Sequence, residues 1–162
     1  MELAIISDTH MPKGARAIPE AALERLRRAD AILHAGDLVG AEVLALLEAL
    51  GPPVHAVHGN VDEPDLMIRL PTVRIVEAEG ARIAMTHDAG PAGGRLGRLR
   101  RRFPDADAVV FGHSHEPLHE EEDGFQIFNP GSPTERRRAP RHTMGWATAR
   151  AGRLELALIA LD

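Results

Sequence analysis

The sequence predicts an α/β fold, a two-sheet β-sandwich flanked by helices in αββα layers. The first half of the chain alternates short apolar runs with helical patterns, whereas the second half is mostly short apolar runs separated by glycine-containing turns. Most apolar runs in the first half end in an Asp, Asn or His side chain. No repeat, linker or low-complexity stretch divides the 162 residues, so we expect one domain over residues 1–162.

The first half of the chain is typical of a β-α-β-α-β series. Three short apolar runs end at polar or glycine residues and predict buried strands, at Leu3–Ile6, Ala31–His34 and Val54–Val57. Pro19 opens a helical pattern with Leu23 and Leu26 on one face, and Glu42–Leu50 predicts a second helix closed by Gly51. This alternation implies neighbouring parallel strands joined by right-handed crossovers.

The second half is predicted to consist mostly of strands. Val73–Val76 and Ile83–Thr86 flank the turn-forming pair Glu79-Gly80 and indicate a hairpin. A basic helix is expected around Gly94–Arg102. The remaining apolar runs predict further strands, at Ala108–Phe111, Pro117–Glu121, Phe125–Phe128, Thr143–Ala149 and Leu154–Ala160. These strands would face those of the first half and complete the sandwich.

Composition narrows the classes of function. The net charge of −5 argues against broad nucleic-acid binding, which normally needs a basic surface. Because the chain has no cysteine, disulfides and thiolate zinc sites are excluded, and any metal must be held by N and O ligands. No stretch approaches the roughly 20 apolar residues of a membrane span, and the start lacks the features of a secretory signal. We therefore expect a cytoplasmic location and no membrane partner.

Side chains of the kinds that bind metals follow the predicted strands: Asp8, His10, Asp37, Asn60, Asp62, His87, His113 and His115. Loops at the carboxyl ends of parallel strands converge, so residues distant in sequence can share one site. Each motif alone has a simpler explanation, and Asp37, for example, could merely cap the helix after it. Gly112-His113-Ser114-His115 is harder to explain by packing. The ordered combination of motifs indicates a metal site.

Together these motifs resemble the calcineurin-like metallophosphoesterase superfamily: Asp8-Thr9-His10, Gly36-Asp37, Gly59-Asn60-Val61-Asp62, His87 and Gly112-His113-Ser114-His115. The short chain and the run Asn129-Pro130-Gly131-Ser132 resemble its small bacterial and archaeal phosphodiesterase branch, similar to the retromer-subunit-like phosphoesterases. The resemblance implies the metallo-dependent phosphatase fold. It implies one metal ion held by Asp8, His10, Asp37 and His115. It implies a second, sharing Asp37 as a bridge, held by Asp37, Asn60, His87 and His113.

Such a site predicts a binuclear metal-dependent phosphodiesterase that hydrolyses a small phosphodiester or nucleotide-like compound. Two divalent ions about 3.5–4 Å apart can clamp a phosphoryl group and bind the hydroxide that attacks it. Mixed His, Asp and Asn ligation suits first-row ions, so we expect Mn, with Ni, Fe, Zn or Co as alternatives. Catalytic roles through metal and phosphate positioning are expected for Asp37, Asn60 and His113.

One departure concerns proton donation to the leaving group. Many larger members of the superfamily carry a proton-donating His directly after the ligand Asn, but this chain has Val61 there. We therefore expect substrates with good leaving groups, and His58, His34 or water as the proton donor. A second departure is Asp88, found where Gly is common, which either turns to solvent or lies near the second metal.

Several alternatives stay open at this point. A phosphomonoesterase or protein phosphatase is disfavoured by Val61, and a nuclease by the acidic charge and the absence of tyrosine. A non-catalytic protein-binding module is the alternative outside the enzymes, since the retromer subunit serves as an interaction scaffold. Relatives also suggest a homodimer or homotetramer. Asp62 either orients a ligand or is a turn carboxylate. The arginines of 98–102 and 136–138 either contact substrate or form solvated surfaces, the second being favoured for both groups.

Overall fold

The computed structural model describes all residues 1–162 and contains two facing five-stranded sheets. The first sheet consists of β1 (Glu2–Ile6), β2 (Ala31–His34), β3 (Val54–Ala56), β9 (Thr143–Arg150) and β10 (Arg153–Ala160). The second consists of β4 (Val73–Ala78), β5 (Ala81–Thr86), β6 (Ala108–Val110), β7 (Leu118–Glu122) and β8 (Phe125–Asn129). The helices are α1 (Glu20–Arg28), α2 (Ala41–Glu48), α3 (Pro64–Arg69) and α4 (Arg95–Arg102), with a 3₁₀ turn at Lys13–Ala15.

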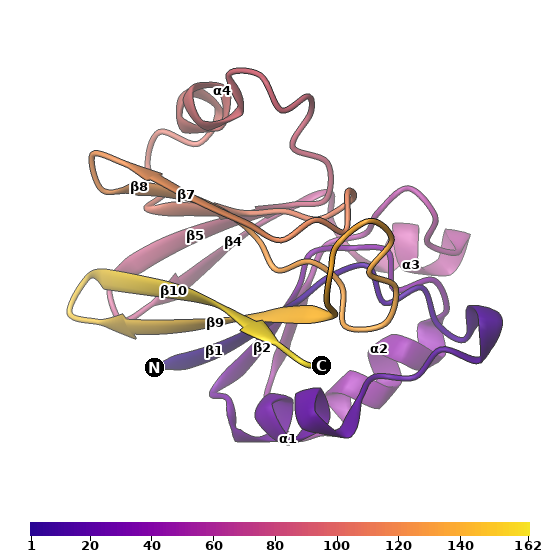
Figure 1. Cartoon of the computed structure of the whole chain (residues 1–162). Coiled ribbons are helices and arrows are strands. Elements are labelled where there is room, and N and C mark those ends of the chain that lie inside the picture. Colours follow the sequence, from indigo (N-terminus) through magenta and orange to yellow (C-terminus); the bar gives the residue numbers. More distant parts are fainter.

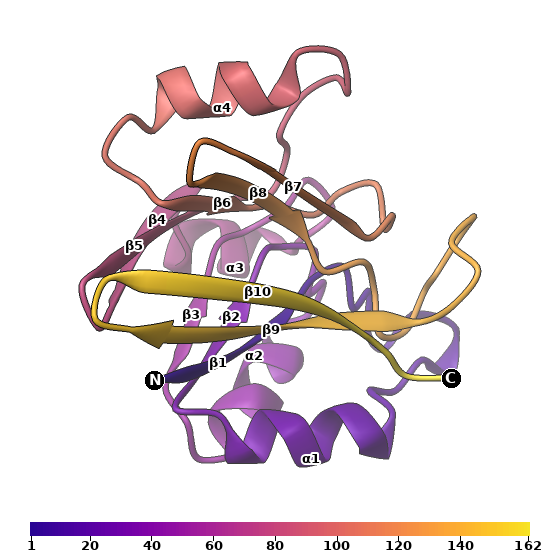
Figure 2. The same cartoon turned by 60° about the vertical axis from the view of Figure 1, so that its left-hand side comes forward.

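The layers follow the predicted order of helix, sheet, sheet and helix. α4 lies over the outer face of the second sheet, and α1 and α2 lie under the first (Figure 1). The turned view separates the same layers and shows β6 between β5 and β8 (Figure 2). The fold is therefore the expected αββα sandwich.

Strand pairing agrees with the pattern of the two halves. β2 lies between β1 and β3 and is parallel to both, as the β-α-β-α-β series predicts. β4 and β5 form the predicted antiparallel hairpin. β9 joins β1 in an antiparallel pair and brings the end of the chain back to the first sheet. As a result, the first sheet has the order β10-β9-β1-β2-β3 and the second the order β4-β5-β6-β8-β7.

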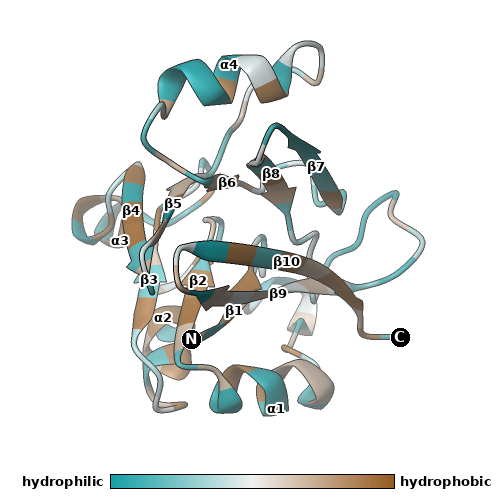
Figure 3. Ribbon diagram, turned by 90° about the vertical axis from the view of Figure 1, so that its left-hand side faces the viewer, coloured by the Kyte–Doolittle hydropathy of each residue, from teal (hydrophilic) through white to brown (hydrophobic).

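Because successive side chains of a strand point to opposite faces of its sheet, the buried apolar residues form three separate cores. Leu3 and Ile5 of β1 belong to the core between the sheets, whereas Ala4 and Ile6 belong to the core under α1 and α2. A third, smaller core packs Leu99 of α4 on the outer face of the second sheet. Hydropathy colouring shows the brown strands enclosed and much of α4 in teal (Figure 3). Both sheets are thus covered, and their loops at one end remain free to form a site.

Two elements were missed from the sequence, and some bounds differ. α3 has only six residues, of which Leu66 alone is buried, so it shows no helical periodicity. The 3₁₀ turn at Lys13–Ala15 has no buried residue. α2 begins one residue earlier and ends two residues earlier than predicted, and β3 ends at Ala56. None of the helices combines the length and apolar character needed to cross a bilayer.

A substitution in β9 should test the packing between the sheets. A Cβ at Gly145 would overlap the Phe128 ring and lie 3.1 Å from the Ile5 Cβ. We expect Gly145→Ala to lower the free energy of unfolding by about 1–3 kcal/mol, because overpacking a buried site strains its neighbours. Urea denaturation measures this loss. Gly93→Ala is the matched control, since a Cβ there meets no atom within 4 Å. Equal stability of the two variants would contradict the prediction.

Candidate metal centre

The loops after five strands meet at one end of the sandwich, on the right in Figure 1. Asp8 follows β1, Asp37 follows β2 and Asn60 follows β3. His87 directly follows β5, and His113 and His115 follow β6. Since β1, β2 and β3 are parallel, their carboxyl ends lie at the same edge, and the parallel pair β5–β6 adds its own loops. The topology therefore brings all seven predicted ligands together.

The side chains form two groups whose ligand atoms lie within 4.8 Å of one another: Asp8, His10 and His115, and Asp37, His87 and His113. In the first group, Asp8 Oδ1 lies 3.4 Å from His115 Nε2 and 3.8 Å from His10 Nε2. Donor atoms bound to one ion at about 2.1 Å lie about 3.0–3.5 Å apart, so the 3.4 Å spacing suits a shared ion and the 3.8 Å spacing is slightly longer.

Asp37 connects the two groups through one carboxylate oxygen. Its Oδ2 lies 3.4 Å from His10 Nε2 and 3.1 Å from His87 Nε2. Its Oδ1 accepts the Val61 backbone N–H at 3.0 Å. Asn60 Oδ1 completes the second group, 3.1 Å from both His87 Nε2 and His113 Nδ1. One oxygen of Asp37 thus faces both groups, the position that a bridging ligand requires.

Two unpartnered nitrogens test whether the residues fit metal ions. His10 Nε2 and His115 Nε2 are buried and have no hydrogen-bond partner. A buried polar atom without a partner costs about 1–3 kcal/mol. The other ring nitrogen, Nδ1, is occupied in His115, where it donates to the Glu135 carbonyl, and in His10 it lies 3.6 Å from Glu135 Oε2. Both rings therefore present Nε2 to the centre, as metal-binding histidines do, and the site fits two cations.

The charges of the site shift the pKa values of its members. Burial alone would lower the pKa of His10, but the neighbouring carboxylates of Asp37 and Asp8 raise it to about 9. Burial would raise the pKa of Asp37, yet His10 and His87 hold it well below its ordinary value. Against the effect of burial, Asp37 and Asp8 raise the pKa of His87. Burial is the main cause that lowers the pKa of His115. The Asp37 carboxylate thus stays ionised and favours positive charge beside it.

The backbone at the site is strained. Five of the seven predicted ligands have a positive φ, which side-chain-bearing residues rarely adopt: Asp8, His10, Asp37, His113 and His115. Such strain costs about 1–3 kcal/mol per residue and persists only where surrounding structure enforces it. Strained residues cluster at functional sites, so the backbone supports the same location as the side chains.

Glycines in the motifs allow the loops to approach each other closely. A Cβ at Gly59 would overlap the Asp37 carboxylate, and one at Gly112 would overlap the Ser7 hydroxyl. Neither glycine has a positive φ, so space and not conformation requires them. The glycine before Asn60 and the glycine before His113 are therefore parts of the site.

Asp62 holds two of the loops in place. Its Oδ2 accepts the backbone N–H of Asp37 at 3.0 Å and of Gly59 at 2.7 Å, and its Oδ1 accepts that of Val39 at 2.7 Å. The side chain is buried and joins the loop after β2 to the loop after β3. Of the two roles left open for Asp62, the structure shows the positioning one, with Asp37 as the oriented ligand.

A third set of contacts comes from the loop after β8, which sequence reasoning largely missed. Ser132 Oγ donates to the Asp8 carbonyl at 2.8 Å, and Thr134 Oγ1 donates to the Thr9 carbonyl at 2.6 Å. Arg16 pairs with Glu135 Oε1 at 2.6 Å, which fixes the carboxylate that faces His10. The run Asn129–Ser132 was the only signal of this loop in the sequence.

The structure separates the remaining histidines. His34 is fully buried, its Nδ1 accepts the Gly36 N–H at 3.1 Å, and its Nε2 lies 3.1 Å from Thr9 Oγ1. With both nitrogens bonded and no exposure, it cannot serve as the proton donor considered above. His58 differs, because its Nδ1 bonds the Gly59 carbonyl and its ring lines a 260 Å³ pocket beside Asn60.

The other residues with open roles lie around the site. Asp88 is exposed, and its Oδ1 accepts the Gly90 N–H at 2.8 Å, a turn contact. Arg137 donates to the His113 carbonyl at 3.3 Å. His119 Nε2 bonds Gln126 Oε1 and His142 Nδ1 bonds Asp162 Oδ2, so both rings have partners outside the two ligand groups.

Comparisons with known proteins agree with this geometry. The family model of the calcineurin-like phosphoesterase superfamily domain matches residues 1–152. A probable metallophosphoesterase of Methanothermobacter thermautotrophicus is 39% identical over 136 residues, 83% of this chain and 78% of that protein. A phosphodiesterase of Methanocaldococcus jannaschii is 27% identical over 81% of this chain and 83% of that protein. The crystal structure of Entamoeba histolytica Vps29 with Zn²⁺ has a TM-score of 0.80 and 26% identity, covering 100% of both chains.

Replacing the Asp62 carboxylate should destabilise the site. In Asp62→Asn, one accepting oxygen becomes an N–H donor that faces a backbone N–H. We expect a loss of about 2–4 kcal/mol in the free energy of unfolding, because hydrogen bonds to charged groups contribute about 1.5–3 kcal/mol each. Denaturant titration measures it. Asp65→Asn on α3 is the control, since the ion pair of Asp65 with Arg69 is exposed. Similar midpoints for the two variants would refute this role.

Stability should depend on the protonation of His34. Burial lowers the pKa of His34 to about 4, against the carboxylates of Asp62 and Asp8 that raise it. The unfolded chain, with an ordinary pKa of about 6.5, therefore binds the proton more strongly between these values. The contribution is complete above about pH 6.5, and about 3 kcal/mol is lost as the pH falls to about 4. Denaturation at a series of pH values in wild type and His34→Gln measures it; the same pH slope in both proteins would contradict the prediction.

Proposed function

The chain belongs to the calcineurin-like phosphoesterase superfamily, and on this premise we propose that it is a phosphodiesterase acting on small phosphodiesters. The observation that carries the proposal is the pair of adjoining ligand groups joined by Asp37 Oδ2. A relative that is 27% identical is a phosphodiesterase, which supports the same reaction class. We also propose that residues 1–162 act as one domain; a homodimer or homotetramer stays a prediction.

Seven side chains are proposed as metal ligands. One ion would be held by Asp8, His10, Asp37 and His115. The other would be held by Asp37, Asn60, His87 and His113. Mixed imidazole, carboxylate and amide ligation favours first-row ions, and we propose Mn, with Ni, Fe, Zn or Co as alternatives. The Zn²⁺ in the similar Entamoeba Vps29 structure is consistent with a site of this kind.

Two divalent ions bound here would polarise the phosphoryl group and lower the pKa of the attacking water. The protein holds the shared Asp37 carboxylate with the Val61 N–H and orients Asn60 between His87 and His113. His113 is exposed and lies at the mouth of the site, where it can also position the phosphate. These contacts fix the reacting groups before substrate arrives, and such preorganisation lowers the barrier.

His58 is the proposed source of the proton for the leaving oxygen. In its imidazolium form, His58 donates Nδ1–H to the Gly59 carbonyl and offers the proton on Nε2 to the leaving oxygen in the pocket beside Asn60. Val61 occupies the place of the acidic His found in larger members of the superfamily. Its backbone holds Asp37, but its side chain has no proton to give. Diesters with good leaving groups should therefore react fastest.

A protein-binding module is the second candidate. Val61, which follows Asn60, and Met67 and Ile68 of α3 are exposed, and Ile68 is 85% exposed. Apolar side chains that gather on a surface favour protein contact. The strained backbone of the site and the presence of all seven proposed ligand side chains favour catalysis instead, because an interaction surface needs neither feature.

Turnover of bis-p-nitrophenyl phosphate tests the proposed reaction. We expect metal-free protein to be inactive and protein supplied with Mn or Ni to be active, with elemental analysis giving about two ions per chain. Asp37→Ala and His115→Ala should each lower kcat/KM at least about a hundredfold, since each removes a ligand. The monoester p-nitrophenyl phosphate should react more slowly than the diester.

Asp65→Asn replaces an exposed residue of α3 and serves as the control for variant preparation. It should keep the wild-type rate. Metal-independent turnover, or full activity in Asp37→Ala, would exclude the proposed mechanism. Retention of two ions with no turnover of either ester would favour the protein-binding module.

A further inference from the structure

A second feature beside the metal centre is a polar pocket of 260 Å³. It lies between the loop after β3, the end of β5 and the end of α4, and none of its lining residues is hydrophobic: His58, Gly59, Asn60, Thr72, Thr86, His87, Asp88 and Arg102. Asn60 and His87 belong to both the pocket and the second ligand group. A group bound in this pocket would therefore lie next to a phosphate held at the second ligand group.

Arg102 is the only arginine of the pocket and differs from other arginines of α4. Arg95 donates to the Gly90 carbonyl, Arg98 to the Ala89 carbonyl and Arg100 to the Glu122 carbonyl. Arg102 makes no hydrogen bond or ion pair, and its guanidinium lies 4.8 Å from the centre of the Phe103 ring. It thus keeps all its donors free.

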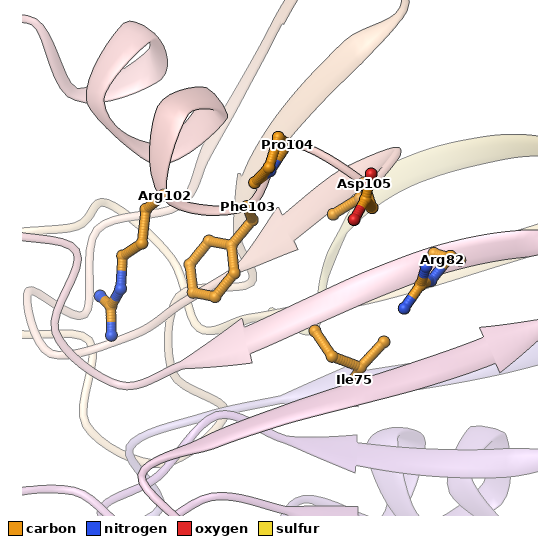
Figure 4. A pocket seen from close by; sticks show the side chains of 7 residues that line it. Ile75, Arg82, Arg102, Phe103, Pro104 and Asp105 are labelled. Atoms are coloured by element: carbon orange, nitrogen blue, oxygen red, sulfur yellow. The ribbon is translucent and has the colours of Figure 1, made fainter.

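The Phe103 ring lies beside Arg102. Figure 4 looks into a neighbouring pocket that shares Arg102, and there the Arg102 side chain runs down one side of the Phe103 ring. Arg82 and Asp105 lie on the other side of that ring in this view. The guanidinium of Arg102 thus contacts the Phe103 ring and forms no ion pair with Asp105, the acidic group of the neighbouring pocket.

The side chains that line the pocket favour an anionic group attached to a polar, hydroxylated part of a ligand. Thr72 and Thr86 add hydroxyl donors, and His58 adds an imidazole. Asp88 is the one carboxylate, and one of its oxygens already accepts the Gly90 N–H. No Phe, Tyr or Trp side chain lines the pocket, and its lining is polar throughout. A free guanidinium suits a phosphate group, which it can contact through two N–H donors.

We propose that this pocket binds a second phosphate on one arm of the substrate, with Arg102 as its cationic contact. The inference rests on the proposed phosphodiesterase function and names the substrate class: diesters that carry a further phosphomonoester, attached through a polar, hydroxylated arm. Arg102 is then a specificity residue that contacts substrate away from the reacting phosphorus.

Matched substrates test this assignment. The p-nitrophenyl ester of thymidine 5′-phosphate is compared with the same ester carrying a 3′-phosphate, in Mn-loaded protein. We expect wild type to prefer the 3′-phosphorylated ester roughly five- to tenfold in kcat/KM, the strength of one exposed charge-assisted contact. Calorimetric titration with thymidine 3′,5′-bisphosphate and thymidine 5′-phosphate should show the same ratio in Kd. In Arg102→Ala both ratios should fall to about one.

Arg101→Ala is the control, because Arg101 is exposed in the same turn of α4, also makes no hydrogen bond and does not line the pocket. It should keep the wild-type ratios. The inference would be overturned if wild type showed no preference for the 3′-phosphorylated compounds. It would also be overturned if Arg101→Ala lost the preference as fully as Arg102→Ala, because the effect would then come from net charge in general. Turnover of bis-p-nitrophenyl phosphate by wild type, measured in parallel, separates this failure from failure of the phosphodiesterase function.

Discussion

The carboxylate of Asp37 is the group on which the rest of the site depends. Its Oδ2 faces His10 and His87, its Oδ1 accepts the Val61 N–H, and its own backbone N–H donates to Asp62. Only 2% exposed, it could not remain ionised without these partners, since an isolated buried charge is very costly. The loops after β2 and β3 therefore fold around one buried negative charge.

This arrangement links stability to metal binding. Carboxylates, unpartnered imidazole nitrogens and residues with positive φ are concentrated at one end of the sandwich. Each disfavours the metal-free fold, and each would be relieved or put to use by bound cations. The binding energy of such ions would offset strain that the two sheets hold in place. The rigid cores beneath the site make that possible, because close-packed interiors resist relaxation.

Whether a feature could be predicted from the sequence depends on how far apart along the chain the interacting residues lie. The strands and the convergence of the seven candidate ligand side chains were predictable, because apolar runs are local and each of these side chains lies within a few residues of the end of such a run. α3 was missed because its six residues include only one buried residue, Leu66, and therefore show no helical periodicity of apolar residues. The contacts of Ser132 with Asp8 and of Asp62 with Asp37 span 124 and 25 residues, and no local pattern encodes them. Gly59 and Gly112 were recognised as motif residues, but the crowding that requires them appears only when the loops meet.

The layers of the fold also separate reaction from recognition. All seven proposed ligands come from loops at the ends of sheet strands, where the backbone is strained and the partners are buried. Arg102 belongs instead to α4, the outer layer, where only Leu99 is buried and side chains can change without disturbing either sheet. A substitution in α4 can therefore alter which substrate arm is held, while Asp37 and its neighbours keep their geometry. The same scaffold can thus serve different diesters, because function resides in sites placed on a fold and not in the fold itself.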